Sequence, residues 1–311
     1  MRRRVVFFGS PAWAVPVLEA LAQHHDVVLA VTQPDKPAGR GLKLKESPVA
    51  ARARELGIPV LKPKRLRKNA EFLEALRALA PDAAVVAAYG KLIPPEVLAV
   101  PKYGFLNLHP SLLPKYRGAA PVNWALIEGE TETGVSIMRL DEGMDTGPLF
   151  RQLRVPIEPQ ESAAELSERL RDLGIPLLLE VLENLENETP RPQEGEPSYA
   201  PLLTKEDGRI RFEEPAERIF SRHRGVQPWP GSWFWHRDKR VKVHALRPEP
   251  GEGKPGEVLA VGPEGVLVAA GEGAVRLLTV QPEGKRPMPA EAWARGYGVA
   301  PGERLGARPD A

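Results

Sequence analysis

The chain has 311 residues, enough for two domains that each bury a core, and its formal net charge at pH 7 is only +2. The absence of cysteine excludes disulfides, a thiolate nucleophile and cysteine-ligated metals. The apolar run that follows the N-terminal arginines, VVFF, is too short for a signal peptide or a membrane span. These features predict a cytoplasmic protein with no membrane segment.

The first half of the chain alternates strand-like with helix-like segments. Helices are expected between the strands, for example at 13–23 and 118–127. Short apolar strands interleaved with helices predict an α/β fold, a Rossmann-like, mostly parallel, twisted sheet with helices on both faces. The predicted strands cover residues 4–9, 27–32, 83–89, 105–109 and 134–140.

A long helix is expected after these strands. Ser162 and Glu165 form a capping-box pattern, and leucines follow at helical spacing, at positions 166, 170, 173 and 177. Pro176 is expected to kink or split this helix, because proline lacks the backbone N–H of the helical ladder.

The composition changes after this helix. Residues 188–206 are rich in proline and polar residues and lack periodicity, which predicts a linker. Beyond it, short alternating stretches at 239–245, 257–261, 266–270 and 274–280 are separated by glycine-rich turns, the pattern of a small OB-like β-barrel. We therefore expect one domain at 1–187, the linker at 188–206 and a second domain at 207–311.

Two polar side chains come at the end of a predicted strand, in the stretch NLHPSLLPKYRGAAP at 107–121. Asn107 and His109 are two positions apart, so they face the same side of the strand, roughly 6–7 Å apart at Cα. The prolines that follow end the strand, at the edge where open α/β sheets carry their chemistry. A lone histidine there is often structural. An amide beside an imidazole, however, suits the oxyanion of an acyl transfer.

A second candidate lies in LDEGMDTGPLF, residues 140–150, directly after a predicted strand. Acidic residues in glycine-rich turns are usually solvated turn formers. Asp145, between Gly143 and Gly147, could nevertheless reach a histidine on the adjacent strand, orient its ring and stabilise its protonated form. Cation binding is a rival interpretation, but the spacing does not match an EF-hand loop.

A third candidate is the basic loop QPDKPAGRGLKLKESP at 33–48, which is too irregular for a packed element. Residues 36–68 hold eleven Lys or Arg against two acidic residues, while 155–198 hold eleven acidic residues against three arginines. The loop could simply be a mobile, solvated surface segment. Its position after the second predicted strand favours phosphate contact instead. Its candidate contacts are Lys36, Arg40, Lys43 and Lys45.

Two further stretches carry weaker signals. FFGSPAWAVP, at 7–16, has one glycine where a dinucleotide fingerprint needs three, so no NAD(P) site is predicted. PWPGSWFWHRDKRVKV, at 228–243, mixes tryptophans with basic residues. Such aromatics usually belong to a core, although they also fit a nucleic-acid contact surface.

NLHPSLLPKYRGAAP and DEGMDTG together resemble the formyltransferase family that uses 10-formyltetrahydrofolate. The resemblance implies that Asn107, His109 and Asp145 are the catalytic trio. It also implies that four residues line the folate site: Ser111, Leu112, Leu113 and Pro114. No metal is implied. The Lys115-Tyr-Arg117 triplet receives no role.

The basic loop, and the tail with QPWPGSW and LLTVQPEGKR, resemble those members of the family that formylate methionine on initiator tRNA. The implied reaction is attack of the methionine α-amino group on the formyl carbon. Asn107 and protonated His109 would stabilise the oxyanion, and Asp145 would tune His109 and accept the amine proton. The implied partners are the acceptor arm of initiator Met-tRNA and the folate. The C-terminal barrel would bind tRNA, and a monomer is expected.

Two alternatives stay open. A nucleotide-sugar formyltransferase or a formyltetrahydrofolate hydrolase-type enzyme could share the trio and a second small domain, but would not require the basic loop at 33–48. A non-catalytic tRNA-binding module would explain the positive segment and the barrel, but not the polar trio at strand ends.

Overall fold

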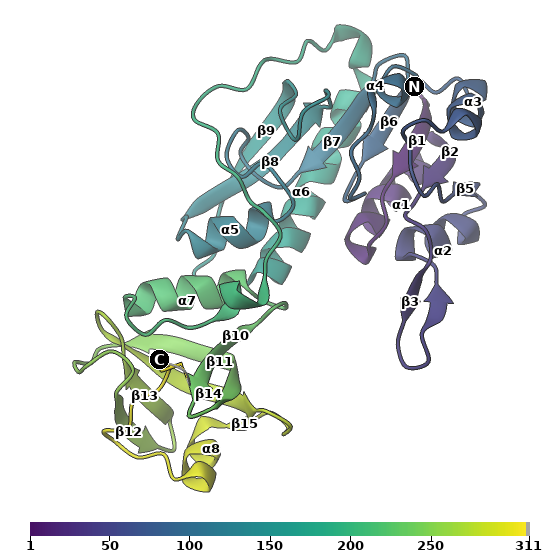
Figure 1. Cartoon of the computed structure of the whole chain (residues 1–311). Coiled ribbons are helices and arrows are strands. Elements are labelled where there is room, and N and C mark those ends of the chain that lie inside the picture. Colours follow the sequence, from purple (N-terminus) through teal and green to yellow (C-terminus); the bar gives the residue numbers. More distant parts are fainter. Residues whose placement is uncertain (309–311) are drawn as a thin grey trace. The chain divides into compact units, whose positions relative to one another are not determined.

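The computed structural model describes residues 1–308, and the chain divides into two compact units (Figure 1). The first unit comprises residues 1–121, 132–156 and 167–200, and the second comprises 122–131, 157–166 and 201–311. Two short internal segments thus group with the C-terminal part. The predicted boundaries at 187 and 207 stay a prediction.

The first unit is built on a seven-stranded sheet with the order β5-β2-β1-β6-β7-β8-β9. The strands from β5 to β7 pair in parallel, while β8 and β9 are antiparallel. The predicted mostly parallel α/β sheet is therefore confirmed. Its strands are β1 (Arg4–Phe8), β2 (Asp26–Val31), β5 (Val60–Leu61), β6 (Ala83–Val86), β7 (Phe105–His109), β8 (Glu132–Arg139) and β9 (Leu149–Pro156).

Helices cover both faces of this sheet. One face packs an apolar cluster with α3 (Ala70–Ala78) and α4 (Pro95–Leu98), into which Phe8 and Phe105 project. On the other face, α6 (Ala163–Glu183) contacts Leu108 and Val135 through Gly174. Two further helices are α1 (Val15–His24) and α2 (Pro48–Glu55).

The long helix α6 begins as predicted. Glu165 N donates to Ser162 Oγ at 3.3 Å, and Ser162 N donates to Glu165 Oε1 at 3.2 Å, which completes the capping box. Of the two expectations for Pro176, the split is wrong, because the helix continues from Ala163 to Glu183 with Pro176 inside it, and the kink stays a prediction. The packing of α6 on β7 and β8 at Gly174 offsets the loss of one backbone hydrogen bond.

The basic segment differs from the irregular loop that its glycines and prolines predicted. It is a hairpin of β3 (Lys36–Ala38) and β4 (Lys43–Lys45), and every residue from 36 to 45 is exposed. Gly39 and Gly41 have positive φ angles of 70° and 88°, as does Leu42 at 50°. The glycines thus shape a turn between two short strands.

The second unit is a separate small β-domain, as predicted. Its antiparallel sheet has the order β10-β11-β14-β13-β12, with β15 on β14. A buried cluster around Trp293, Phe234 and Phe212 fills its interior. Its elements are α5 (Pro121–Ile127), α7 (Ala216–Gly225), β10 (Ser232–His236), β11 (Lys239–Glu249), β12 (Val258–Gly262), β13 (Gly265–Ala269), β14 (Ala274–Pro282), β15 (Met288–Pro289) and α8 (Ala290–Tyr297).

The tryptophan-rich stretch belongs mainly to this β-domain. Trp233 on β10 is 5% exposed, and its indole N–H donates to the carbonyl oxygen of Lys205 at 2.8 Å. The Arg240 guanidinium lies 4.5 Å from the ring centre of Trp233 and 5.1 Å from that of Trp235. This stacking stabilises the outer side of β10 and β11. Trp229, in contrast, is 54% exposed.

Among residues 1–308, no helix combines the length and the apolar character needed to cross a membrane.

Candidate active site

Asn107 and His109 lie on β7, with Asn107 opposite Met138 of β8 and His109 opposite Ser136. His109 is the last residue of the strand and is only 5% exposed. Asn107 is half-buried, and its side-chain amide makes no hydrogen bond with any other part of residues 1–308. A half-buried amide without a protein partner is free to bind a ligand.

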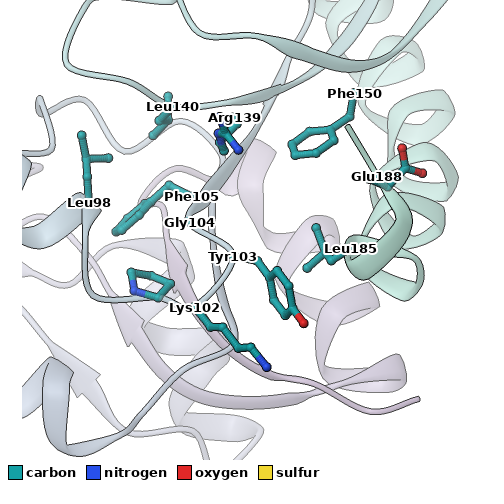
Figure 2. A pocket seen from close by; sticks show the side chains of 11 residues that line it. Leu98, Lys102, Tyr103, Gly104, Phe105, Arg139, Leu140, Phe150, Leu185 and Glu188 are labelled. Carbon is teal, nitrogen blue, oxygen red and sulfur yellow. The ribbon is translucent and has the colours of Figure 1, made fainter. Parts of the chain in front are cut away.

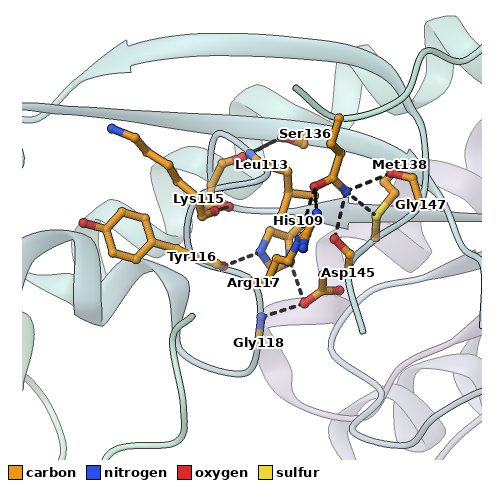
Figure 3. Close-up of polar contacts among 12 residues, drawn as sticks. His109, Leu113, Lys115, Tyr116, Arg117, Gly118, Ser136, Met138, Asp145 and Gly147 are labelled. Atoms are coloured by element: carbon orange, nitrogen blue, oxygen red, sulfur yellow. Dashed lines mark hydrogen bonds and ion pairs between the residues drawn. The ribbon is translucent and has the colours of Figure 1, made fainter. Parts of the chain in front are cut away.

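The contacts of the His109 ring determine which nitrogen carries a proton. Nε2 lies 2.9 Å from the backbone carbonyl oxygen of Tyr116 (Figure 3). Because a carbonyl oxygen only accepts, Nε2 must carry the hydrogen and donate it. Nδ1 is then the nitrogen that gains a proton when the ring becomes cationic.

Asp145 faces this second nitrogen. Its Oδ2 lies 3.8 Å from His109 Nδ1, and the same oxygen accepts a hydrogen bond from Gly118 N at 2.7 Å (Figure 3). A separation of 3.8 Å is too long for a hydrogen bond but close enough for a charge interaction. The Asp145 side chain is 14% exposed, so water screens this interaction only partly.

The loop that carries Asp145 does not begin next to His109, as it would if β8 were parallel to β7. Because β8 is antiparallel to β7, its last residue, Arg139, lies beside Leu106, near the beginning of β7. The loop 140–148 therefore begins at the end of the strands opposite His109 and has to fold back toward His109. Asp145 has a left-handed φ of 56°, which is unusual for a non-glycine residue.

Contacts inside the loop hold this fold. Asp141 Oδ1 accepts hydrogen bonds from Gly143 N at 2.9 Å and Thr146 Oγ1 at 2.6 Å. A Cβ added at Gly147 would overlap the carbonyl oxygen of Arg139, so only glycine allows this close approach. The sequence analysis noted only that Gly143 and Gly147 flank Asp145.

The turn after β7 contains the four residues that the resemblance assigned to folate. Ser111, Leu113 and Pro114 are buried, whereas Leu112 is half-buried. Ser111 Oγ donates to the carbonyl oxygen of Lys115 at 2.7 Å, so its hydroxyl stabilises the turn. Only Leu112 therefore offers side-chain surface, and a folate role for the four stays a prediction.

Two polar residues of the neighbouring strands fix this turn. Ser136 Oγ donates to the Ser111 carbonyl oxygen at 2.7 Å and accepts from Leu113 N at 3.2 Å. Gln152 Nε2 donates to Ser136 Oγ and to the Leu113 carbonyl oxygen, both at 2.9 Å.

The basic hairpin is separate from this hydrogen-bonded site. Within residues 1–308, its candidate cations Lys36, Arg40, Lys43 and Lys45 form no ion pair with an acidic side chain, and no hydrogen bond joins them to the trio. The acidic residues at its base are already paired, since Lys62 lies 2.7 Å from Asp35 and 3.3 Å from Glu46. Hydrogen bonding from Arg54 holds the pKa of Glu46 below its usual value. The exposed positive charge of the hairpin is therefore uncompensated.

A pocket of about 400 Å³ lies at the beginning of β7 rather than at its end (Figure 2). Lys102, Tyr103, Phe105, Arg139, Phe150 and Glu188 contribute to its lining. None of the predicted site residues lines it. Among residues 1–308, no group of three or more His, Asp or Glu side chains is arranged to hold a metal ion.

Comparison with known proteins identifies the family. Residues 2–182 match the family described as formyl transferase, and residues 202–298 match the formyl transferase C-terminal domain. The chain is 67% identical to the methionyl-tRNA formyltransferase of Thermus thermophilus over 303 residues, 97% of this chain and 99% of the relative. It is 53% identical to the methionyl-tRNA formyltransferase of Deinococcus radiodurans, covering 97% and 95% of the two chains.

Solved structures of low identity share the fold. HypX of Aquifex aeolicus, solved with tetrahydrofolic acid, is 22% identical with a TM-score of 0.65, and the alignment covers 96% of this chain and 47% of HypX. An N-formyltransferase of Helicobacter canadensis, solved with folinic acid and dTDP-3-aminofucose, is 17% identical with a TM-score of 0.66, covering 91% of this chain and all of the other. The two family matches and the identity along nearly the whole chain show that the protein belongs to the formyl transferase family, in the group of the methionyl-tRNA formyltransferases.

Proposed function

We propose that this protein transfers the formyl group of 10-formyltetrahydrofolate to the α-amino group of methionine on initiator Met-tRNA. The observation that carries the proposal is the arrangement of an unpartnered Asn107 amide beside His109, with Asp145 Oδ2 3.8 Å from His109 Nδ1. The relatives that match the whole chain are named for this reaction.

In the proposed mechanism, the neutral α-amino group attacks the formyl carbon, and the formyl oxygen becomes negative. The Asn107 amide donates to this oxygen. Because His109 Nε2–H is already bound to the Tyr116 carbonyl, the proton on Nδ1 is the one available to the oxyanion. Asp145 balances the charge of the imidazolium from 3.8 Å without capturing its proton in a hydrogen bond.

The amine proton has to leave before the formamide is complete. The Asp145 carboxylate has one oxygen engaged by Gly118 N, at 2.7 Å, which leaves its other oxygen to accept a proton through water. The proton released by the amine passes back through Asp145 and water to the folate nitrogen as its bond to the formyl carbon breaks, so one proton is released and one is taken up.

The folate would approach the half-buried Leu112 and the Asn107 amide, which has no partner within residues 1–308; both lie near the end of β7. Ser111, Leu113 and Pro114 would contribute through the shape of their turn, which Ser136 and Gln152 hold. An apolar side chain beside a hydrogen-bonding amide fits a ligand with an apolar ring system and polar edges.

The hairpin at 36–45 would bind the phosphates of the acceptor arm. Lys36 and Lys45 lie directly opposite each other across its two strands, where like charges destabilise the pair. A polyanion relieves this repulsion and releases counterions, which favours binding. The cations are Lys36, Arg40, Lys43 and Lys45.

We further propose that residues 1–187 carry catalysis, that 188–206 link the two domains, and that 207–311 help to bind tRNA. We expect the protein to act as a monomer in the cytoplasm, where its tRNA substrate is found.

The test is formyl transfer from 10-formyltetrahydrofolate to purified Met-tRNA, with uncharged tRNA and free methionine as controls. We expect transfer to Met-tRNA but not to uncharged tRNA or free methionine. The Arg40→Ala substitution and added salt should each weaken this transfer. Folate turnover without formylation of Met-tRNA would contradict the proposed acceptor and indicate another formyl acceptor.

A further inference from the structure

Gln193 is joined by five hydrogen bonds to the segments that carry the site; four have oxygen as acceptor, and the fifth runs from Nε2 to Met138 Sδ at 3.7 Å. Its Nε2 donates to the backbone carbonyl oxygens of Asp145 and Gly147, both at 2.8 Å. Its Oε1 accepts from Arg117, at 3.2 Å from Nε and 2.8 Å from Nη2. The side chain therefore uses both N–H groups and both acceptor positions of its amide.

These partners permit one orientation of the amide only. Carbonyl oxygens accept and cannot donate, whereas a guanidinium donates and cannot accept. Rotating the amide by half a turn would face oxygen with oxygen and N–H with N–H. Arg117 thus fixes the orientation in which Gln193 binds the loop of Asp145.

The backbone on either side of Gln193 is itself anchored, although its composition resembles a linker. On one side, Leu149 N donates to the Arg191 carbonyl oxygen at 2.7 Å, and Arg191 N donates back at 2.9 Å. On the other side, Arg117 N donates to the Ser198 carbonyl oxygen at 2.8 Å. Gln193 therefore starts from a fixed backbone rather than from a free tether.

The segment 116–118 connects Gln193 with both members of the His109–Asp145 pair. The Tyr116 carbonyl accepts from His109 Nε2, and Gly118 N donates to Asp145 Oδ2 (Figure 3). Between them, Arg117 binds Gln193, which in turn binds the Asp145 backbone. The histidine and the carboxylate are thus held by one connected set of contacts.

We propose that Gln193 is a positioning residue for formyl transfer, which keeps the Asp145 carboxylate at its distance from His109 by binding the carbonyls of Asp145 and Gly147. This inference rests on the proposed function. Asp145 has a left-handed backbone with a φ of 56°, a conformation that persists only where neighbouring contacts enforce it. Without Gln193, two carbonyls lose their donors and the loop relaxes away from His109.

The test compares Gln193→Met, which keeps the length of the side chain but removes its hydrogen bonds, with wild type. The kcat of Met-tRNA formylation is expected to fall about 10- to 100-fold, while KM for Met-tRNA and for the folate stays within about twofold. Glu194→Gln is the matched control, because Glu194 is exposed on the same segment and has no ion pair within the described chain. It should retain wild-type kcat.

A double-mutant cycle with Asp145→Asn separates positioning from a general loss of structure. If Gln193 acts through Asp145, the double variant Gln193→Met/Asp145→Asn should be no slower than Asp145→Asn alone. Additive losses, an unchanged kcat in Gln193→Met, or a loss confined to KM would each overturn the inference.

If Gln193→Met does not fold, Arg117→Met carries the same cycle, because it leaves the donors of Gln193 in place but removes the group that orients them. It should lower kcat less than complete loss of the Asp145 carboxylate does. Failure of the wild-type protein to formylate Met-tRNA would count against the proposed function, whereas wild-type formylation with full activity in the variants would count against this inference alone.

Discussion

Gly147→Ala tests whether the loop that carries Asp145 has to stay where it is. A Cβ at Gly147 would overlap the carbonyl oxygen of Arg139, and it would lie 3.0 Å from the carbonyl carbon of Arg139 and 3.4 Å from Asp141 N. All three are backbone atoms, which cannot swing aside as the end of a side chain can. Because carbon and carbonyl oxygen approach to about 3.3 Å, the loop has to move by about 1 Å or more.

This movement would displace Asp145, two residues earlier, from its position 3.8 Å from His109 Nδ1. A misplacement of about 1 Å in a reacting arrangement can lower the rate about 100-fold, so we expect kcat to fall by about that factor. Strain from the added methyl group should also destabilise the fold by about 1–3 kcal/mol.

The assay is single-turnover formylation of Met-tRNA at saturating folate, with thermal unfolding measured in parallel. Gly262→Ala, at the end of β12, is the matched control, since a Cβ there meets nothing within 4 Å. A Gly147→Ala protein with more than half of the wild-type kcat and an unchanged Tm would refute the argument that close backbone packing positions Asp145.

Three further expectations concern the oxyanion donors, the basic hairpin and an ion pair of the second unit. Asn107→Ala and His109→Ala should each lower kcat about 10²–10³-fold, as loss of an oxyanion donor typically does, and more than a tenth of wild-type activity in either folded variant would contradict the assignment. Arg40→Ala should reduce the slope of log kcat/KM against log salt by about 1, because one phosphate contact is lost, and an unchanged slope would speak against the hairpin. In the second unit, hydrogen bonding from Arg276 lowers the pKa of Glu249 from 4.5 to about 2. Because the pKa is lower in the folded state, ionised Glu249 stabilises the fold above about pH 4.5, and this stabilisation is lost as the pH falls toward 2. Urea unfolding over this range should therefore show that the difference in the free energy of unfolding between wild type and Glu249→Gln decreases with acidification. An increase would contradict the prediction.

Local sequence was sufficient where a short-range rule governs the structure. The alternation of side chains along a strand places Asn107 and His109 on one face, and Pro110 and Pro114 end the strand just after them. The capping box of Ser162 and Glu165 likewise involves neighbours only. Each of these features depends on residues a few positions apart.

Features that depend on distant partners could not be predicted from the sequence. The apolar pattern of 134–140 predicted a strand but contains nothing that fixes its direction, so the antiparallel pairing of β8 was not foreseen. The aromatic run of β10 lacked a clear alternation of polar and apolar residues, since Ser232 and His236 are buried along with Trp233 and Phe234. Strand direction and burial are set by the rest of the sheet.

The role of Gln193 was hidden for the same reason. Its hydrogen-bond partners Arg117 and Asp145 lie 76 and 48 residues earlier in the chain. A stretch rich in proline and glutamate has the composition of a linker whether it is solvated or docked, because prolines also suit an extended segment that binds through its carbonyls and side chains. The only local signal was a neutral amide among charged neighbours, which by itself has no structural meaning.

The antiparallel direction of β8 explains why the site needs these distant contacts. A catalytic carboxylate at the end of a parallel strand would be positioned by the sheet itself. Asp145 instead lies on a loop that starts at the opposite end of the strands. Its position therefore depends on the turn within the loop, on the packing of Gly147 against Arg139, and on Gln193. Substitutions at Gly147 and Gln193 should therefore lower kcat although neither residue touches the reacting atoms.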